Sequence, residues 1–388
     1  MAEQELREFD VTDEQRELRT ALHRFAERQH DEATLRRLVD TADGFDRALW
    51  SRLGTELGAL SLAVPEDLGG AGGTCVDQAV AAEELGAALV TGPLLGTVAL
   101  AVPALVAAPA GAERDALLAA LADGSRTAAL VARLTTPYDG ASAAGVTADG
   151  DRFSGTVSHV PDAGAADVLV VAAAGVDGPV LAVVDASADG VRVQRRGSFD
   201  VTRPVARVVL DGATGSVLAT GADADGALRH AFRTAGALLA AEQAGIARRL
   251  LDLTVAYARE RLQFGRPIGS FQAVKHRCAD MLVAVEQART AALHAAWAVD
   301  DPRIDDADLA VSIAQATCSE TAYRVAADAV QLHGGIGFTW EHVAHLYYKR
   351  AVADAALLGS AEAHRERIAA LVLDTLGDDV REPRVATG

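Results

Sequence analysis

Two pairs of residues near the C-terminal end have types and spacing that could do chemistry. His342 and His345 stand three positions apart in EHVAH, a spacing that would place two imidazoles on one face of a helix. No third ligand is evident, so we expect a pair on a helix surface and no metal site. Gly334 and Gly335 would let the backbone approach a ligand closely and expose its N–H groups, although a glycine pair also commonly ends a helix.

The other candidate features are weaker. The glycine-rich stretch from Pro65 to Gly73 lacks the Lys-Ser/Thr ending of a phosphate-binding loop, so we interpret it as a turn. Cys75, Cys278 and Cys318 form no CxxC pair, which favours a reducing cytosol without a disulfide framework. Cys278 and Cys318 fall on apolar helical stripes and are expected to be packed thiols.

Composition limits the classes of partner. The chain has 388 residues, 50% of them hydrophobic, and a formal net charge of -18. Such a charge argues against nucleic acid and anionic membranes as partners, and any anionic ligand would need local positive groups. The start MAEQELREFD does not resemble a signal peptide, and the weakly polar stretch 91–110 contains Gly and Pro, so it indicates a buried helix pair and not a membrane span. We therefore expect a cytoplasmic protein.

Three regions must position these residues. Up to about Asp123 the pattern predicts helices, the first of them begun by a capping box of Thr12 and Gln15. Between about 127 and 220, β-rich runs are separated by Asp-Gly pairs typical of tight turns. The predicted strands are Thr127–Leu134, Arg152–Val160, Asp167–Ala173, Val180–Asp185, Val191–Arg195 and Val205–Leu210.

From about Asp223 the chain predicts long helices to its end. Apolar residues recur every three or four positions, as in Leu228, Phe232 and Leu239, with almost no proline. This pattern indicates an antiparallel bundle of four helices. The predicted fold is α+β and mostly helical: an N-terminal helical domain (1–123), a middle antiparallel β domain (124–222) and a C-terminal helical bundle (223–388).

Three segments, in this order, resemble the acyl-CoA dehydrogenase family. They are LWSRLGTELGALSLAVPEDLGGAGG followed by AAEELGAAL, then YARERLQFGRPIGSFQAVKHRCADM, then QLHGGIGFTWEHVAHLYYKRA. The resemblance implies FAD as cofactor, an acyl-CoA substrate and an electron acceptor such as an electron-transfer flavoprotein. It also implies removal of a proton from the α carbon of the thioester and of a hydride from its β carbon.

The resemblance assigns one group of residues to the cofactor. In the family, this part of the bundle reaches across a dimer interface to the adenosine-diphosphate half of a neighbour's FAD. A diphosphate favours a cation that also donates hydrogen bonds, which is the role implied for Arg261. The residues that match the family's segments are Arg261, Gln263, Phe264, Phe271, Gln272, Gln331, His333, Gly334 and Gly335.

No carboxylate occupies the family's positions for the catalytic base. One position, after an Arg-Asp-Ala-like turn, falls at Gly359, and the alternative one falls at about Ala235. Glu242 and Glu362 are the nearest carboxylates. A general base must lie within hydrogen-bonding distance of the proton that it removes, so we expect both to be solvated surface residues instead.

Three further positions depart from the family. The segment that usually lies by the flavin ring is LTTPYDGAS here, residues 134–142, and the aromatic-Ile-Thr segment behind the ring is His159-Val160-Pro161. Pro161 cannot donate a backbone N–H. Ala351 follows Arg350 where the family usually has Asp.

The half of the site that faces a neighbour is therefore kept, and the half that holds the chain's own flavin ring and base is lost. This division resembles the heteromeric acyl-CoA dehydrogenases of actinobacteria, some of which act on CoA thioesters of sterol side chains. It implies a second, dehydrogenase-like subunit that carries the catalytic glutamate. Three alternatives remain open: a homomeric dehydrogenase with a relocated base, a scaffold subunit without redox activity, and a flavin oxidase on the same fold.

Overall fold

The N-terminal part of the chain is helical, as predicted. The computed structural model describes residues 11–41, 43–140 and 145–380. Thr12 and Gln15 form the expected capping box in front of α1. The helices are α1 (Asp13–Gln29), α2 (Glu32–Val39), α3 (Arg47–Thr55), η1 (Glu66–Leu68), α4 (Cys75–Ala87), the π-helical η2 (Leu94–Ala101), α5 (Val102–Ala107) and α6 (Ala112–Ala122).

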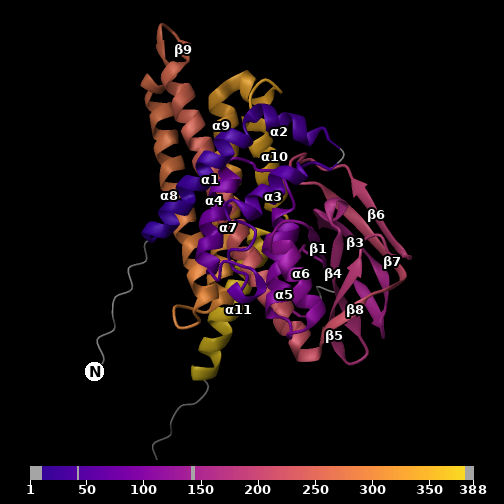
Figure 1. The fold of residues 1–388 in the computed structure, drawn as a ribbon. Helices are drawn as coiled ribbons and strands as arrows, with labels where there is room; N and C mark the ends of the chain where they lie inside the picture. Colours follow the sequence, from indigo (N-terminus) through magenta and orange to yellow (C-terminus); the bar gives the residue numbers. More distant parts are fainter. Residues whose placement is uncertain (1–10, 42, 141–144, 381–388) are drawn as a thin grey trace, which may run out of the picture.

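The middle part is a sheet that lies on one side of the molecule (Figure 1). Its strands are β1 (Ala128–Val131), β2 (Val146–Asp149), β3 (Arg152–Pro161), β4 (Val168–Gly175), β5 (Gly178–Asp185), β6 (Val191–Arg196), β7 (Val205–Thr214) and β8 (Ser216–Thr220). All six predicted strands are present, whereas β2 and β8 were not predicted. The order is β6-β7-β3-β2-β4-β5-β8, with β1 also on β4. Most pairs are antiparallel, but β1 and β2 both run parallel to β4, so the sheet is mixed and the expectation of a purely antiparallel one was wrong.

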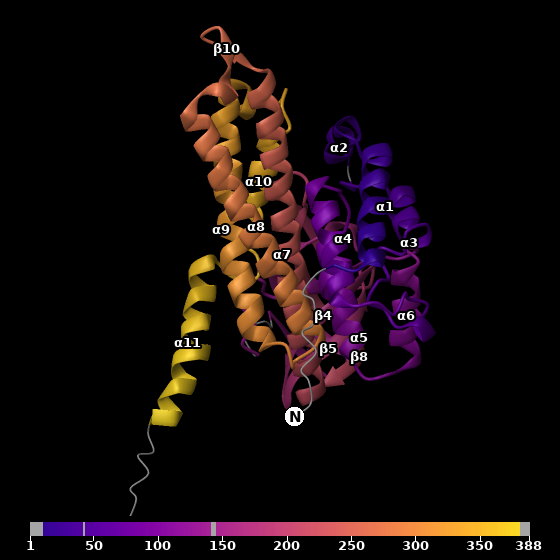
Figure 2. The ribbon, with the colours of Figure 1, turned by 90° about the vertical axis from the view of Figure 1, so that its left-hand side faces the viewer.

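The C-terminal part is the helical bundle, on the opposite side from the sheet (Figure 1). It consists of α7 (Gly221–Glu260), α8 (Gln272–Asp300), α9 (Ala307–His333), η6 (Gly334–Phe338), α10 (Ala344–Asp354) and α11 (Ala361–Val380). A short hairpin of β9 (Leu262–Gln263) and β10 (Arg266–Pro267), followed by η5 (Ile268–Ser270), joins α7 to α8. Figure 2 shows this hairpin at one end of the bundle and α11 extending from the other. The predicted domain boundaries at residues 123 and 222 stay predictions.

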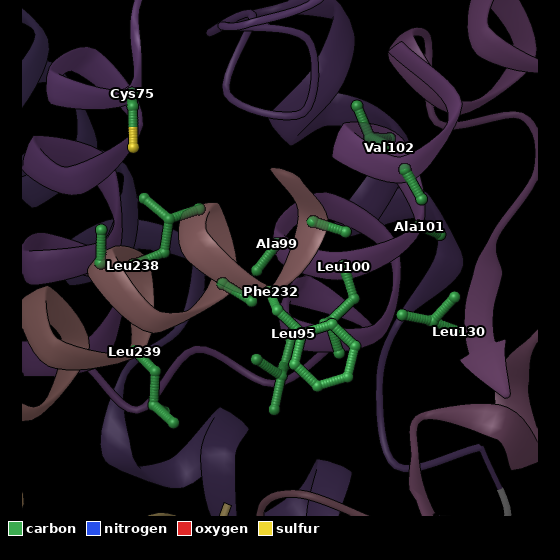
Figure 3. Packing of buried hydrophobic residues seen from close by; sticks show 14 of the residues in the cluster. Cys75, Leu95, Ala99, Leu100, Ala101, Val102, Leu130, Phe232, Leu238 and Leu239 are labelled. Carbon is green, nitrogen blue, oxygen red and sulfur yellow. The ribbon is translucent and has the colours of Figure 1, made fainter. Parts of the chain in front are cut away.

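Helix α4 packs closely on α7 and joins the N-terminal helices to the bundle. A Cβ atom at Gly86 would stand 2.6 Å from Cγ of Glu242, and one at Gly245 would stand 2.0 Å from the carbonyl oxygen of Glu83. Only glycine permits this approach at either position. The largest apolar core spans α4, η2, α5 and α7, where Leu95 and Phe232 lie together (Figure 3). The stretch 91–110 is therefore a buried helical segment, as predicted, and within the described residues no helix is long and apolar enough to cross a membrane.

Candidate functional site

The antiparallel course of the bundle brings the predicted cofactor residues to one end of it. The end of α7, the start of α8 and the end of α9 meet beside the β9–β10 hairpin (Figure 2). Stacking of Tyr257, near the end of α7, on His333, the last residue of α9, fixes the two helix ends to each other, with ring centroids 4.6 Å apart. We call this region the bundle tip and define it by the nine residues predicted to contact the cofactor.

Most side chains of the bundle tip are exposed. Arg261 follows directly after α7 and makes no ion pair with any described residue. Phe264 is 91% exposed at the turn of the hairpin, with φ +52°. Phe271 is half-buried, because the guanidinium of Arg266 stacks 4.1 Å from its ring centroid. The exposed members are Arg261, Gln263, Phe264, Gln272, Gln331, Gly334 and Gly335.

These groups fit the diphosphate half of an FAD that approaches from outside the chain. Arg261 offers a cation with several donors, and Gly334 (φ +67°) begins a short helical turn in which an added Cβ at Gly334 or Gly335 would meet nothing within 4 Å. The open space in front of this backbone suits close approach by a ligand. The assignment of the individual residues to FAD stays a prediction.

His333 differs from its neighbours in the bundle tip, because its side chain is buried. Its Nδ1 lies 2.7 Å from the carbonyl oxygen of Ala329, and its ring is also 4.3 Å from the ring centroid of His342. His345 is buried as well, edge-on to Trp340 at 4.5 Å. The expectation that His342 and His345 form an exposed pair on a helix surface was therefore wrong: His342 precedes α10 and is only half-exposed.

The predicted base position has no room for a side chain. Gly359 adopts φ +115°, and a Cβ atom there would stand 2.6 Å from Cδ of Pro137. The backbone N–H of Leu358 donates to the carbonyl oxygen of Leu134 at 2.6 Å, so the loop before α11 is fixed to the segment after β1. Ala235, the alternative position, is fully buried in α7. Neither position carries a side chain that could accept a proton.

Tyr138, the residue after Pro137, packs against the bundle. Its ring packs 4.9 Å from that of Phe232 on α7, and its hydroxyl donates to Asp225 at 2.7 Å. Arg367 on α11 donates to the carbonyl oxygen of Tyr138 at 2.6 Å. The segment after β1, which in the family usually lies by the flavin ring, is here held against the bundle by the chain's own side chains. Its last two residues, Ala141 and Ser142, lie outside the described residues.

A buried network of charges lies deeper between the sheet and the bundle. Arg350 on α10 donates to Asp200 at 2.7 Å and to Glu242 at 2.6 Å, and Arg203 donates to the same Glu242 at 2.7 Å. Arg203 also pairs with Asp354. We call this region, together with Pro137, Tyr138 and Gly359, the sheet–bundle junction.

Glu242 is a member of this network and not a solvated surface residue, so that expectation was wrong. Burial alone would raise the pKa of Glu242, but Arg203 and Arg350 hold it below its ordinary value. A carboxylate that is ionised and engaged by two guanidinium groups is a poor proton acceptor. Glu362, by contrast, is exposed on the first turn of α11, as expected.

The end of β3, which was expected to lie behind the flavin ring, forms hydrogen bonds within the chain. Asp162, directly after Pro161, has φ +60° and accepts a hydrogen bond from the N–H of Gly96 in η2 at 2.8 Å. Burial raises the pKa of Asp162 to about 6. His159 is exposed and Ala351 is fully buried. The sheet therefore caps the π-helix through Asp162 instead of presenting a donor to a ligand.

The cavities at the junction are small. One of about 40 Å³ lies between α4, η2 and α7, beside Gln78, Leu95 and Glu242. Another of about 30 Å³ lies between Pro137, Phe232 and Arg367. Each has room for only a few water molecules.

Sequence reasoning missed the partners in the network. Arg203 and Asp200 stand in the loop before β7, and Asp354 ends α10. No motif spacing connects these residues, because they approach one another only when the sheet packs on the bundle.

The comparisons with known proteins identify the family. The acyl-CoA dehydrogenase N-terminal domain matches residues 12–125, and the acyl-CoA dehydrogenase C-terminal domain matches residues 226–373. The chain is 36% identical to the acyl-CoA dehydrogenase IpdE2 of Mycolicibacterium smegmatis, over 93% of this chain and 100% of that one. The chain belongs to the acyl-CoA dehydrogenase family, whose cofactor is FAD.

Two similar solved structures bear the same fold. A variant of the steroid ACAD Tcur3481-Tcur3483 superposes with a TM-score of 0.84 at 32% identity, covering 94% of this chain and 99% of that one. The ChsE4-ChsE5 complex from Mycobacterium tuberculosis gives 0.84 at 29% identity, covering 97% and 99%. The resemblance to the acyl-CoA dehydrogenase family, including its heteromeric members, is thus confirmed.

Proposed function

We propose that this chain is one subunit of a mixed acyl-CoA dehydrogenase. It supplies the adenosine-diphosphate side of an FAD site to a partner subunit, and the partner carries the catalytic glutamate. The observation that carries the proposal is the contact of Pro137 with Gly359, which fills the position expected for the chain's own base.

In the proposed site the residues of this chain bind and orient, and they transfer no proton. Arg261 would donate to the diphosphate, the exposed Gly334–Gly335 turn would allow the same anion to approach closely, and Phe264 would contact the cofactor from the hairpin. Bound FAD would accept the hydride from the β carbon of the acyl thioester, while the partner's glutamate takes the proton from the α carbon. The product would be the α,β-unsaturated thioester, and the electrons would leave the flavin for an acceptor such as an electron-transfer flavoprotein.

Exposed apolar side chains support a partner at this side of the bundle. Leu282 and Val283 on α8 are 50% and 58% exposed, and Tyr323 on α9 is half-exposed. Together with Phe264 they are large apolar groups that a soluble subunit usually covers by association. Leu282, Val283 and Tyr323 lie on α8 and α9, the helices that also contribute to the bundle tip, so an FAD bound there would lie close to such a partner.

Two relatives support a substrate class. Tcur3481-Tcur3483 is called a steroid enzyme, and ChsE4-ChsE5 is a complex of two different chains. We propose the CoA thioester of a sterol side chain as substrate and a heterotetramer as the assembly. The three cysteines are free, which agrees with a cytoplasmic location.

The ion pairs of Glu242 count against a homomeric enzyme with a relocated base. A relocated base at Glu362 would have to act from an exposed helix turn. A scaffold without any redox role would not need an exposed Arg261 that makes no ion pair with a described residue, at the same end of the bundle as the Gly334–Gly335 turn. Neither alternative is favoured by a specific contact.

Reconstitution tests the proposal. The chain is purified alone and together with a dehydrogenase-like chain from the same gene neighbourhood that retains a glutamate. Reduction of an artificial electron acceptor is then measured with a panel of acyl-CoA thioesters that includes sterol side-chain thioesters. We expect turnover only from the mixture, and none when the partner's glutamate is replaced by Gln. Turnover by this chain alone would overturn the proposal.

A further inference from the structure

Three aromatic rings from separate parts of the chain stack behind the exposed residues of the bundle tip. Tyr257 belongs to α7, His333 ends α9, and His342 stands between η6 and α10. The ring centroids are 4.6 Å apart for Tyr257–His333, 4.3 Å for His333–His342 and 6.5 Å for Tyr257–His342. We call these three residues the ring stack.

Hydrogen bonds define the protonation state of both imidazoles. Nδ1 of His333 lies 2.7 Å from a carbonyl oxygen, which can only accept, so this nitrogen carries a proton. Nδ1 of His342 accepts from the backbone N–H of Ala344 at 3.1 Å, so this nitrogen carries none. His342 is therefore neutral, since an imidazolium has no acceptor.

His333 is held neutral by its surroundings. It is 3% exposed, and its Nε2 has no hydrogen-bond partner among the described residues. A proton on that nitrogen would place a charge in a buried position without an acceptor. Burial accordingly lowers the pKa of His333, and burial followed by the proximity of His333 lowers that of His342.

The ring stack connects the two parts of the proposed diphosphate site. Tyr257 stands one helical turn before Arg261, whose backbone N–H donates to the carbonyl oxygen of Tyr257 at 2.9 Å. His333 directly precedes Gly334, and a Cβ atom on Gly337 would stand 2.9 Å from Cβ of His333. The spacing between the Arg261 backbone and the glycine turn is thus fixed by ring packing.

We propose that His333 and His342 are positioning residues that hold Arg261 and the Gly334–Gly335 turn at the separation that an FAD diphosphate requires, and that they do so only as neutral rings. This inference rests on the proposed function. FAD binding would fix the glycine turn and would therefore favour the neutral form of His342. Protonation of His342 at low pH should then weaken FAD binding.

The charged groups around the stack do not reverse this expectation. Glu32 on α2 raises the pKa of His342 and Arg36 on α2 lowers it. Burial lowers the pKa of His345 on α10 to about 4. A ring whose pKa is lowered in the folded state contributes stability that is complete above its ordinary pKa of about 6.5 and is lost as the pH falls toward the lowered value. The affected window therefore lies below about pH 6.5.

The test measures the FAD dissociation constant of the reconstituted complex between pH 5 and pH 8. For the unmodified complex we expect an affinity weaker by roughly threefold to tenfold at the acid end, since one unit of pKa difference is tenfold in an equilibrium. His342→Asn keeps an acceptor for the Ala344 N–H but does not titrate. It should bind FAD more weakly than the unmodified complex at pH 8, because the stacked ring is missing, and it should lose most of the pH dependence.

Two outcomes would overturn the inference. In the first, His342→Asn keeps the full pH dependence. In the second, FAD binds more tightly in acid and this gain disappears in His342→Asn, which would make His342 a direct phosphate ligand. Arg261→Ala in the same titration separates the proposals, because an unchanged affinity in that variant contradicts the proposed function itself.

A second readout needs no partner. Spectra of the full chain labelled with ¹⁵N-histidine should show the Nδ1–H tautomer for His333 and the Nε2–H tautomer for His342 at neutral pH. Rapid exchange between tautomers, or a protonated His342 near neutral pH, would contradict the ring stack as described.

Discussion

The bundle tip and the sheet–bundle junction both contain arginines, but the arginine of the tip is exposed and those of the junction are buried in ion pairs. Arg261 at the tip is exposed and forms no ion pair with a described residue. Arg203 and Arg350 at the junction are buried and bind three carboxylates of the same chain, Asp200, Glu242 and Asp354. A buried charge is tolerated only when it is paired, whereas an exposed arginine remains available for a ligand.

The difference separates a closed region from an open one. In the junction, Pro137 occupies the space next to the expected base position, and the two cavities that remain have volumes of about 40 and 30 Å³. In the bundle tip, the backbone of Gly334 and Gly335 has nothing in front of it. The chain thus fills the junction with its own side chains, whereas it leaves the groups of the bundle tip exposed.

The largest expected effect comes from opening the junction. Arg350→Ala would leave Asp200 and Glu242 buried without their guanidinium partner, and removing one member of such a pair costs about 3–5 kcal/mol. We expect this loss in the free energy of unfolding measured with urea. Arg192→Ala, which removes an exposed pair 3.7 Å from Asp211, is the matched control and should change little. A loss below about 1 kcal/mol for Arg350→Ala would show that the network does not hold the junction together.

A loss of similar size in the free energy of unfolding is expected when a carboxylate is placed at the family's base position. Gly359→Glu must adopt φ +115° and displace Pro137, and strain and overpacking each cost about 1–3 kcal/mol. The variant should unfold more easily and should gain no dehydrogenase activity.

Gly226→Ala is the control for this substitution. Its added Cβ meets nothing within 4 Å, and the residue lies inside α7, so it should stabilise the chain slightly. A stable Gly359→Glu protein that reduces an acceptor with an acyl-CoA would show that the junction is not closed.

At the open side, Arg261→Ala should weaken FAD binding in the complex by roughly tenfold or more, because a charge-assisted pair contributes about 1.5–3 kcal/mol. Equilibrium titration of the apo complex measures this. The stability of the chain should stay the same, since the side chain is exposed and makes no ion pair with a described residue. An unchanged dissociation constant would place Arg261 outside the cofactor site.

The smallest effect is expected for Glu362→Gln. The carboxylate is exposed at the start of α11, so turnover of the complex should stay within about twofold of normal. If this substitution stopped the reaction while the fold and the flavin content persisted, Glu362 would be a relocated base, and the homomeric interpretation would replace ours.

Much of the fold followed from local patterns in the sequence. The capping box of Thr12 and Gln15, the Asp-Gly turns and the apolar stripes of the long helices all depend on neighbouring residues. The missed strands, β2 and β8, are short and have only one clearly buried residue each. The parallel pairing of β1 and β2 with β4 depends on packing between distant segments, which no local pattern records.

The two regions of the candidate site differed in the same way. An antiparallel bundle must bring the end of α7, the start of α8 and the end of α9 to one end, so the position of the bundle tip could be predicted. The sequence also showed that the family's two base positions hold no carboxylate, because they are occupied by Gly359 and Ala235. The burial of Glu242 was not, since its partners Arg203 and Arg350 come from a loop of the sheet and from α10.

Flavin content tests the central claim most directly, because it shows whether the chain can hold FAD by itself or only together with a partner. The chain is purified alone and in complex with its partner, and bound flavin is released and counted per chain. We predict little or no flavin on the chain alone and about one FAD for each pair of unlike chains in the complex. A yellow preparation of this chain alone, with close to one FAD per chain, would contradict the division of the site between two subunits.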